Sequence, residues 1–312
     1  MVMSMPVKGA HVFPGQGAQA VGMGRDLYDG FTAARDVFKE ADEVLGFSLS
    51  KMCFEGPEEE LLLTINAQPA IVTVCYACLK AAQEVSAGRL IEPDFVAGHS
   101  LGEYTALAAA NVLDLGSTVR LTRERGRLMH EAGLKQPGSM AAIIGLDEDV
   151  LGEVCKETGT QIANFNCPGQ LVITGAEDRV ARAMDLAKEK GAARVVPLVV
   201  SGAFHSPLMQ PAVEGLAEII GTLDFKDPSV PIIANTTARP LTTGAEVRTE
   251  LINQVSNSVQ WQRSIEYMID NGVSTFIEIG PGRALTGMIK RINKDADTVN
   301  ITDAETVKSL GQ

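Results

Sequence analysis

The sequence predicts an α/β protein with a doubly wound, mostly parallel sheet and a small module inserted into it. Short apolar, β-branched runs alternate with longer segments of helical periodicity, and this alternation is typical of a parallel α/β sheet. Between residues 135 and 200 the predicted elements follow the order β-α-β-β-α-β, which is that of a ferredoxin-like unit. The length of 312 residues suits one large body that carries such an insert.

The first part of the chain predicts two strands and four helices. The strands are short apolar runs at residues 11–13 and 94–97. The helices have apolar residues three and four positions apart, and they cover residues 32–45, 68–85, 103–111 and 114–132. Asp114 precedes the last of these helices as a suitable N-cap.

The inserted module and the last part of the chain complete the prediction. In the module, strands are expected at residues 139–146, 161–166, 170–174 and 193–199, with helices at 147–157 and 177–190. Beyond it, helices are expected at residues 207–223, 246–255, 262–271 and 284–293, with strands at 230–234 and 275–279. We therefore assign residues 1–134 and 201–312 to the main body and residues 135–200 to the small subdomain.

Charge and hydropathy exclude several classes of function. The net charge of −12 and the pI of about 4.9 argue against nucleic acid as a partner. The most apolar stretch, residues 70–82, contains Lys80 and is too short to span a bilayer. No basic segment followed by a long apolar run opens the chain, so no signal peptide is predicted. We expect a cytoplasmic protein that does not enter a membrane, and nothing in the sequence requires more than a monomer.

The chain has five cysteines, of which Cys75 and Cys78 form a C-x-x-C pattern. The pattern lies within a helical run and lacks the second pair or flanking turn that a zinc or redox site needs. We expect these thiols to pack in the core of a protein from a reducing compartment, and we expect no metal or other cofactor.

The most informative motif is Gly98-His99-Ser100-Leu101-Gly102, which fits G-x-S-x-G between an expected strand and an expected helix. The two glycines let strand and helix approach closely around a strained serine, so that its hydroxyl projects from the turn. The helix N-terminus offers free N–H groups and a positive dipole end to a developing oxyanion, with Leu101 as the first donor. The pattern predicts Ser100 as a nucleophile.

A serine hydroxyl needs an adjacent base, and the chain has four histidines. His11 opens a strand and His130 lies in a charged helix, so both are expected to be structural or solvated. His99 adjoins the nucleophile, where an orienting role fits better. His205 lies in a loop where the chain re-enters the main body, and catalytic groups often occupy such loops. We predict His205 as the base. No acidic residue between Ser100 and His205 is singled out as its partner, and an amide or a carbonyl group could orient the ring instead.

A serine nucleophile with a histidine base predicts covalent acyl transfer, and three other functions compete with this interpretation. The segment Gly15-x-Gly17-x-x-Ala20 matches a relaxed dinucleotide fingerprint, but Asp36 falls inside an expected helix and not at the end of a second strand. A serine esterase or thioesterase uses the same kind of turn and passes its acyl group to water. A noncatalytic scaffold has no reason to hold an intact serine and histidine pair.

Five segments in one order carry a resemblance to a known family. They are PGQGAQ (14–19), GHSLGEY (98–104), RERGRLM (123–129), GAFHSP (202–207) and FIEIGPGRAL (276–285). Together they resemble malonyl-CoA:acyl carrier protein transacylases and the acyltransferase domains of fatty acid and polyketide synthases. The resemblance covers residues 11–291 and implies a hydrolase-like main body with a ferredoxin-like insert, while the pathway, fatty acid or polyketide, stays open.

The resemblance implies catalytic roles at matching positions. Ser100 matches the acylated serine, and His205 matches its base. Gln16 matches a second oxyanion donor, which acts through its backbone N–H beside that of Leu101. Gln254 matches the residue whose backbone carbonyl orients the histidine ring.

Two further positions imply selectivity for malonyl groups. Arg125 matches the arginine that binds the malonyl carboxylate, and Phe204 resembles the residue found in malonyl-selective synthase domains. A planar guanidinium binds a carboxylate through two parallel hydrogen bonds, which Lys cannot imitate. A substrate that lacks the carboxylate leaves this fork unpaired, at a cost of about 2–5 kcal/mol if the fork is desolvated. Arg120, Arg123 and Arg127 are expected to face solvent.

The resemblance also implies malonyl-CoA and acyl carrier protein as partners, in a ping-pong cycle through a malonyl ester on the serine. Acyl carrier proteins are acidic as a family, so docking to this acidic chain needs a local basic surface. Four candidate cations lie along the last expected helix and its ends: Arg283, Lys290, Arg291 and Lys294. An ordinary solvated helix face is the alternative interpretation of these four residues.

Overall fold

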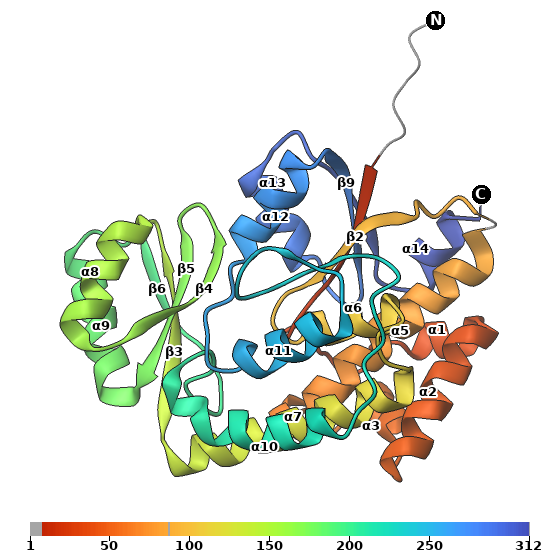
Figure 1. Cartoon of the computed structure of the whole chain (residues 1–312), viewed down its shortest axis with the longest axis horizontal. Helices are drawn as coiled ribbons and strands as arrows, with labels where there is room; N and C mark the ends of the chain where they lie inside the picture. Colours follow the sequence, from red (N-terminus) through yellow and green to blue (C-terminus); the bar gives the residue numbers. More distant parts are fainter. Residues whose placement is uncertain (1–7, 87, 312) are drawn as a thin grey trace, which may run out of the picture.

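Residues 8–86 and 88–311 are described by a computed structural model, which shows a six-stranded sheet between helices and a separate four-stranded module (Figure 1). Along the larger sheet the strand order is β10-β9-β1-β2-β7-β8. Neighbouring strands are parallel except β7 and β8. The strands are β1 (Lys8–Phe13), β2 (Pro93–Gly98), β7 (Ile232–Ile233), β8 (Pro240–Leu241), β9 (Val273–Ile279) and β10 (Asp297–Ile301).

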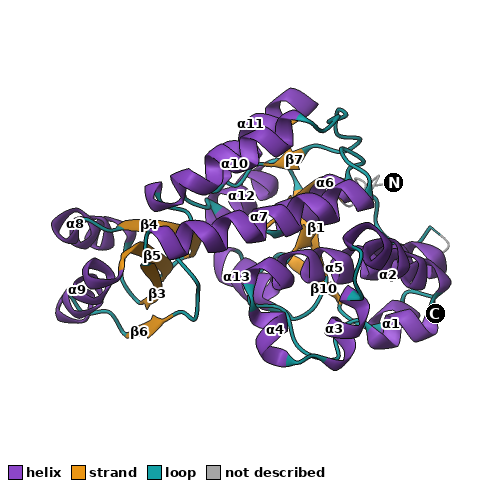
Figure 2. Ribbon diagram, turned by 90° about the horizontal axis from the view of Figure 1, so that it is seen from below, coloured by secondary structure: helices purple, strands orange, loops and turns teal. Residues whose placement is uncertain are grey.

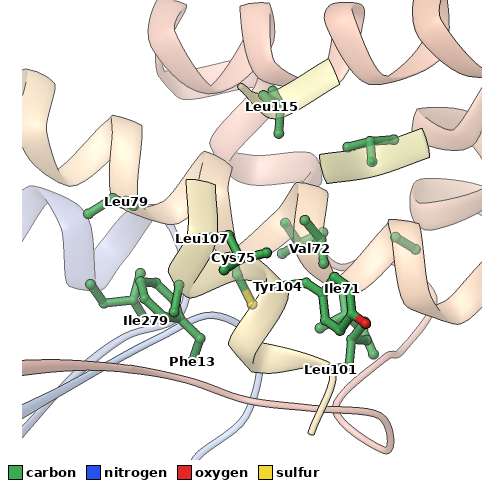
Figure 3. Close-up of a cluster of buried hydrophobic side chains, with 14 of the residues drawn as sticks. Phe13, Ile71, Val72, Cys75, Leu79, Leu101, Tyr104, Leu107, Leu115 and Ile279 are labelled. Atoms are coloured by element: carbon green, nitrogen blue, oxygen red, sulfur yellow. The ribbon is translucent and has the colours of Figure 1, made fainter. Parts of the chain in front are cut away.

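The two faces of this sheet bury separate hydrophobic clusters. Ala10 and Val12 of β1 pack in one cluster with helices α12 (Trp261–Asp270) and α13 (Ala284–Ile292). Phe13 packs in the other, with helices α5 (Thr64–Ser86) and α6 (Gly102–Ala109) (Figure 3). Because successive residues of a strand point to opposite faces, a central strand that is buried on both sides belongs to a doubly wound sheet. The predicted fold class is confirmed for this body.

Most helices of the main body were predicted, and the short ones were not. Its other helices are α1 (Arg25–Gly30), α2 (Thr32–Leu45), α3 (Leu49–Glu55), α4 (Glu58–Leu62), α5 (Thr64–Ser86), α6 (Gly102–Ala109), α7 (Leu115–Lys135), η1 (Pro207–Met209), α10 (Gln210–Gly221), α11 (Gly244–Gln254) and α14 (Ala304–Ser309). The helices α1, α3, α4 and α14 were not predicted, because helices of seven residues or fewer show too few repeats of the helical period. The short strands β8 and β10 were not predicted either.

Helix α5 begins four residues before its predicted start and carries Pro69 in its interior. Proline has no N–H, so the carbonyl oxygen of Ile65, four residues earlier, receives no helical hydrogen bond. Nη1 of Arg123 donates to that oxygen at 3.0 Å, so helix α7 supplies the missing donor. The expectation that Arg123 merely faces solvent is therefore wrong.

The four-stranded module has strand order β4-β5-β3-β6 with antiparallel neighbours, and helices α8 and α9 lie together on its outer side (Figure 2). Its elements are β3 (Gly138–Ile144), α8 (Glu148–Thr158), β4 (Gln161–Cys167), β5 (Gln170–Ala176), α9 (Glu177–Glu189) and β6 (Arg194–Pro197). This arrangement is consistent with the predicted ferredoxin-like unit. The boundaries placed at residues 135 and 200 remain a prediction.

Backbone pairing joins the module to the main body. The N–H of Phe165 in β4 donates to the carbonyl oxygen of Val259 at 2.9 Å, and the N–H of Val259 donates to Ala163 at 2.8 Å. The hydroxyl of Ser258 adds a hydrogen bond of 2.6 Å to the carbonyl oxygen of Ile162. The edge strand of the module is thus covered by the segment that precedes α12, which fixes the module beside the carboxyl edge of the larger sheet.

The cysteines belong to the core. All five are buried free thiols, and Cys75 and Cys78 are fully buried in α5, as predicted. Burial raises the pKa of both thiols, so neither is a ready nucleophile. Within residues 8–86 and 88–311, no helix combines the length and the apolar character that crossing a membrane would require.

Candidate active site

The turn between β2 and α6 holds Ser100 in a left-handed backbone conformation with φ of 49°. A Cβ atom on Gly98 would lie 1.9 Å from the backbone carbon of Gly102, so only glycine allows strand and helix to approach this closely. A Cβ atom on Gly102 would lie 2.1 Å from the carbonyl oxygen of Phe13, at the end of β1. Strain and close approach are the two features that a G-x-S-x-G nucleophile turn requires.

Ser100 meets His205 at this turn. The Oγ atom of Ser100 lies 2.7 Å from Nε2 of His205. The other ring nitrogen, Nδ1, lies 2.9 Å from the carbonyl oxygen of Gln254 and 3.1 Å from that of Asn257. Because a carbonyl oxygen only accepts, Nδ1 carries the proton and the lone pair of Nε2 faces the serine hydroxyl. This is the tautomer that a general base for the serine needs.

The surroundings of His205 keep its ring neutral. The residue is 3% exposed, and burial lowers its pKa to about 3, with the positive charge of Arg125 acting in the same direction. Hydrogen bonds to the carbonyl groups of Gln254 and Asn257 act in the opposite direction but are outweighed. The ring is therefore free to take a proton near pH 7, and the carbonyl dipoles at Nδ1 stabilise the imidazolium that forms.

Helix α7 places Arg125 in the same pocket, where it is 2% exposed. Its Nη2 atom lies 3.3 Å from Oγ of Ser100 and 2.8 Å from Oε1 of Gln254, and its Nη1 atom lies 2.8 Å from Oε1 of Gln68. The guanidinium carbon lies 5.1 Å from the centre of the Tyr104 ring. In the described part of the chain, Nε is a buried donor with no partner. The two terminal nitrogens of the guanidinium are thus hydrogen-bonded to amide oxygens, so the group is not left unpaired before substrate binds.

Gln254, at the end of α11, connects these groups through its side chain as well as its backbone. Its Nε2 atom donates to the carbonyl oxygen of Ser100 at 2.9 Å and to the carboxyl group of Glu103 at 2.5 Å. Its Oε1 atom accepts from Arg125, and its backbone carbonyl accepts from His205. Of these contacts, the family resemblance implied only that of the backbone carbonyl with the histidine.

Two backbone N–H groups are available to an oxyanion. Within residues 8–86 and 88–311, the N–H groups of Gln16 and Leu101 donate to no hydrogen bond. The loop that holds Gln16 follows β1 and packs on the nucleophile turn, since a Cβ atom on Gly15 would lie 2.3 Å from the carbonyl oxygen of His99. The side chain of Gln16 is held by the hydroxyl of Thr64, which donates to its Oε1 at 2.9 Å.

Two asparagines that the sequence analysis did not single out brace the turn. Oδ1 of Asn235 accepts from the N–H of Ser100, and its Nδ2 donates to the carbonyl oxygen of Gly98, both at 2.7 Å. Oδ1 of Asn166, at the end of β4, lies 2.7 Å from Nε2 of His99. His99 therefore links the turn to the small module, which fits the orienting role predicted for it. Both asparagines follow or end an expected strand, where a polar residue is a usable signal of a site.

The remaining predicted site residues lie around this pocket or outside it. Phe204 precedes the histidine and is 6% exposed. The four cations of the proposed docking patch are all exposed: Arg283, Lys290, Arg291 and Lys294. Nζ of Lys290 donates to the carbonyl oxygen of Ala296 at 2.6 Å, and Nη1 of Arg291 donates to Oε1 of Gln170 at 2.9 Å. Lys290 and Arg291 are thus held at the surface by hydrogen bonds within the protein.

The dinucleotide alternative is wrong. Asp36 lies inside α2, and the next strand along the chain after β1 begins only at Pro93. The glycine-rich loop after β1 does not open a helix directly, because α1 begins at Arg25. His11 is a buried strand residue whose Nε2 lies 2.9 Å from the carbonyl oxygen of Ile91, as expected for a structural histidine.

Comparison with known sequences identifies relatives over nearly the whole chain. A family model for the acyl transferase domain matches residues 10–311. The malonyl CoA-acyl carrier protein transacylase of Bacillus subtilis (strain 168) is 47% identical over 304 residues, which cover 96% of this chain and 95% of the relative. The protein of the same name from Staphylococcus aureus (strain MRSA252) is 40% identical over 310 residues, which cover 98% of this chain and 99% of the relative.

Solved structures of similar proteins share both parts of the fold. The acyl-carrier-protein-S-malonyltransferase of Bartonella henselae matches with a TM-score of 0.94 and 43% identity, covering 98% of this chain and 100% of that one. A malonyl-transacylase solved in complex with its type II polyketide synthase acyl-carrier protein matches with a TM-score of 0.93 and 39% identity, covering 97% of this chain and 98% of that one.

Proposed function

The chain belongs to the acyl transferase domain family, and we propose that it moves a malonyl group from malonyl-CoA to the phosphopantetheine thiol of acyl carrier protein through an ester on Ser100. The observation that carries this proposal is the 2.7 Å contact between Ser100 and a neutral His205 beside the buried guanidinium of Arg125. A nucleophile, its base and a binding group for a carboxylate meet in one pocket.

In the first half-reaction Ser100 is acylated. Nε2 of His205 takes the hydroxyl proton while Oγ attacks the thioester carbonyl carbon of malonyl-CoA. The N–H groups of Gln16 and Leu101 bind the oxyanion, and Arg125 binds the malonyl carboxylate. The carbon–sulfur bond then breaks, and coenzyme A leaves with the proton from His205.

In the second half-reaction the same residues work in reverse. His205 takes the proton of the carrier thiol, whose sulfur attacks the ester carbonyl carbon. The bond from that carbon to Oγ breaks, and Ser100 regains its proton from His205. In this scheme the sulfur–carbon bond forms as the carbon–Oγ bond breaks, His205 carries the proton, and the N–H groups of Gln16 and Leu101 stabilise the oxyanion.

A thioesterase of related fold is the second candidate. It would use the same serine and histidine but has no need of a buried arginine beside the nucleophile. Arg125 is held by three side chains in that position, which supports selection of an acyl group with a free carboxylate. The relatives from Bacillus subtilis and Staphylococcus aureus are also named as transacylases.

Several finer points belong to the same proposal. We place the protein in the cytoplasm, since five buried free thiols suit a reducing compartment, and we expect it to act as a monomer. We assign carrier docking to the exposed cations around α13 and part of the malonyl selectivity to Phe204. Residues 135–200 form the small subdomain in this scheme, and residues 1–134 and 201–312 the catalytic body.

Intact mass measurement tests the central claim. The protein is mixed with malonyl-CoA alone and then with carrier protein. We expect a gain of one malonyl group, which is absent in Ser100→Ala and is discharged by the carrier. If no adduct forms and free malonate accumulates, the enzyme is a thioesterase.

A further inference from the structure

The positive charge of Arg125 is buried without a carboxylate partner. In the described part of the chain there are eight ion pairs, all at the surface, and none of them includes Arg125. Its two terminal nitrogens instead donate to the amide oxygens of Gln68 and Gln254, each at 2.8 Å. The buried carboxyl group of Glu103 contacts the far side of the Gln254 amide and acts on the guanidinium from there. A buried cation whose direct acceptors are neutral is positioned and still attracts an incoming anion.

A chain of hydrogen bonds fixes which end of the Gln68 amide meets Arg125. Nε2 of Gln68 donates to Oγ1 of Thr64 at 3.0 Å, and the Thr64 hydroxyl donates to Oε1 of Gln16 at 2.9 Å. Since a guanidinium has only donors, it requires the oxygen of the amide. Both ends of the side chain therefore demand the same orientation, and the chain connects the oxyanion loop to Arg125. Gln68 itself is fully buried.

We propose that Gln68 is a specificity-determining residue, which positions the guanidinium of Arg125 without neutralising it and so makes the acyl pocket select groups that carry a free carboxylate. This inference rests on the proposed function. When a malonyl group binds, its carboxylate replaces an amide oxygen on the fork, and a charge-assisted hydrogen bond replaces a weaker neutral one. A carboxylate at position 68 would occupy the fork permanently and would repel the substrate.

Gln68 is the better position for a test than Gln254. The amide nitrogen of Gln254 donates to Ser100 and Glu103, and its backbone orients His205, so a substitution there disturbs the nucleophile as well. Among the described residues, the amide nitrogen of Gln68 donates only to the hydroxyl of Thr64 and, at 3.5 Å, to the sulfur of Met129. A change at Gln68 therefore reaches the chemistry through Arg125 and the Thr64 hydroxyl.

The experiment compares two substitutions of nearly the same size. Gln68→Glu adds a negative charge against the guanidinium, whereas Gln68→Met removes the amide and leaves the pocket charge unchanged. Gln83→Glu, on the exposed side of the same helix, is the matched control for the added charge. The second-order rate constants for acylation of Ser100 by malonyl-CoA and by acetyl-CoA are measured by rapid quench and intact mass, with the thermal midpoint of each variant.

The readout is the ratio of the malonyl to the acetyl rate constant. We expect Gln68→Glu to lower this ratio by at least about 100-fold, Gln68→Met to lower it by less than about 10-fold, and Gln83→Glu to leave it unchanged. A purely structural role of Gln68 would slow both thioesters alike and leave the ratio constant in Gln68→Glu, which overturns the inference.

Two further outcomes of the experiment also have a definite meaning. If Gln68→Glu does not fold, Gln68→Met decides: a lowered malonyl-to-acetyl ratio in that variant supports positioning of the guanidinium by the amide, and a ratio equal to that of the wild type overturns the inference. If the wild-type protein forms no malonyl adduct, the proposed function itself is wrong, and the inference ends with it. A normal wild-type adduct with an unchanged ratio in Gln68→Glu overturns the inference alone.

Discussion

The Nδ1 atom of His205 lies 2.9 Å from the carbonyl oxygen of Gln254, so a neutral backbone group orients the ring that we propose as the base. A carboxylate in this place would raise the pKa of the histidine by its charge. Here no acid contacts the ring within residues 8–86 and 88–311, and burial together with Arg125 dominates. The titration of the base is therefore moved well below its usual range.

The first prediction concerns the pH dependence of acylation. Because the pKa of His205 lies at about 3, the base stays deprotonated as the pH falls from 8 to 5.5. We expect the rate constant for acylation by malonyl-CoA to change by less than about twofold over this range. Rapid-quench measurements at several pH values test this, and a rate that halves near pH 6.5 would contradict it.

The second prediction concerns stability in acid. Burial lowers the pKa of His11 from 6.5 to about 4 and outweighs the hydrogen bond to Ile91. Between these values the unfolded chain binds a proton that the folded chain does not, so the free energy of unfolding falls as the pH falls through this window. His11 alone should remove about 2 kcal/mol between pH 7 and pH 5.

Urea unfolding of the wild type and of His11→Gln measures this contribution. Glutamine keeps an N–H donor near the carbonyl oxygen of Ile91 but does not titrate. We expect the variant to lose less stability than the wild type on acidification, by roughly the amount that His11 contributes. Parallel pH profiles for the two proteins would rule out this role of His11.

The third prediction concerns Arg125. Arg125→Ala removes the group that we expect to bind the malonyl carboxylate, so the rate of acylation by malonyl-CoA should fall by about 100-fold or more. Acylation by acetyl-CoA should fall much less, because Ser100 and His205 remain in contact. Arg127→Ala is the matched control on the same helix, since Arg127 pairs with Glu124 and Glu131 at the surface. An undiminished preference for malonyl over acetyl would refute the assignment.

The fourth prediction concerns carrier docking. Lys290→Glu with Arg291→Glu should slow malonyl transfer to acyl carrier protein while leaving acylation by malonyl-CoA unchanged, because only the first process needs the basic surface. Arg283→Glu should act in the same direction, and its side chain makes no hydrogen bond within the described residues. Lys39→Glu, on the solvent-exposed face of helix α2, is the control. Equal effects on both half-reactions would argue against the patch.

The sequence predicted those parts of the site that depend on neighbouring residues. Ser100 and Leu101 belong to one continuous turn, so their placement follows from a local pattern of glycines between a strand and a helix. Contacts that join distant segments leave no local signal, so His205 was predicted from its place in a loop, and Arg125 and Gln254 from the family resemblance alone. Gln68 reaches Arg125 across 57 positions, and its side chain lies in the interior of a helix where a buried glutamine has no distinctive spacing.

The same distinction applies to the fold. Long amphipathic helices such as α2 (Thr32–Leu45) show enough periods to be recognised, and the prediction differs from the structure mainly at their ends. The two-residue strand β7 was predicted over residues 230–234 because its flanks are also apolar. Only Ile232 and Ile233 pair in the sheet, because the turn that follows at Asn235 bends the chain back into the antiparallel β8. That turn depends on contacts with the nucleophile loop.

The last prediction concerns this turn. Asn235 binds both sides of the strained serine, since Oδ1 accepts from the N–H of Ser100 and Nδ2 donates to the carbonyl oxygen of Gly98. Asn235→Ala leaves both buried backbone groups without partners, at a cost of about 1–3 kcal/mol for each group. We expect a lower thermal midpoint and slower acylation by malonyl-CoA and acetyl-CoA alike, because Asn235 positions the nucleophile and not the acyl group.

Asn253→Ala provides the control for Asn235, since its exposed side chain makes no hydrogen bond in the described part of the chain. A selective loss of malonyl acylation in Asn235→Ala would place this residue in substrate recognition, and unchanged rates for both thioesters would show that the glycines alone hold the turn. A parallel decrease for both thioesters, with an intact malonyl preference, assigns Asn235 to the support of Ser100 and separates it from the residues around Arg125.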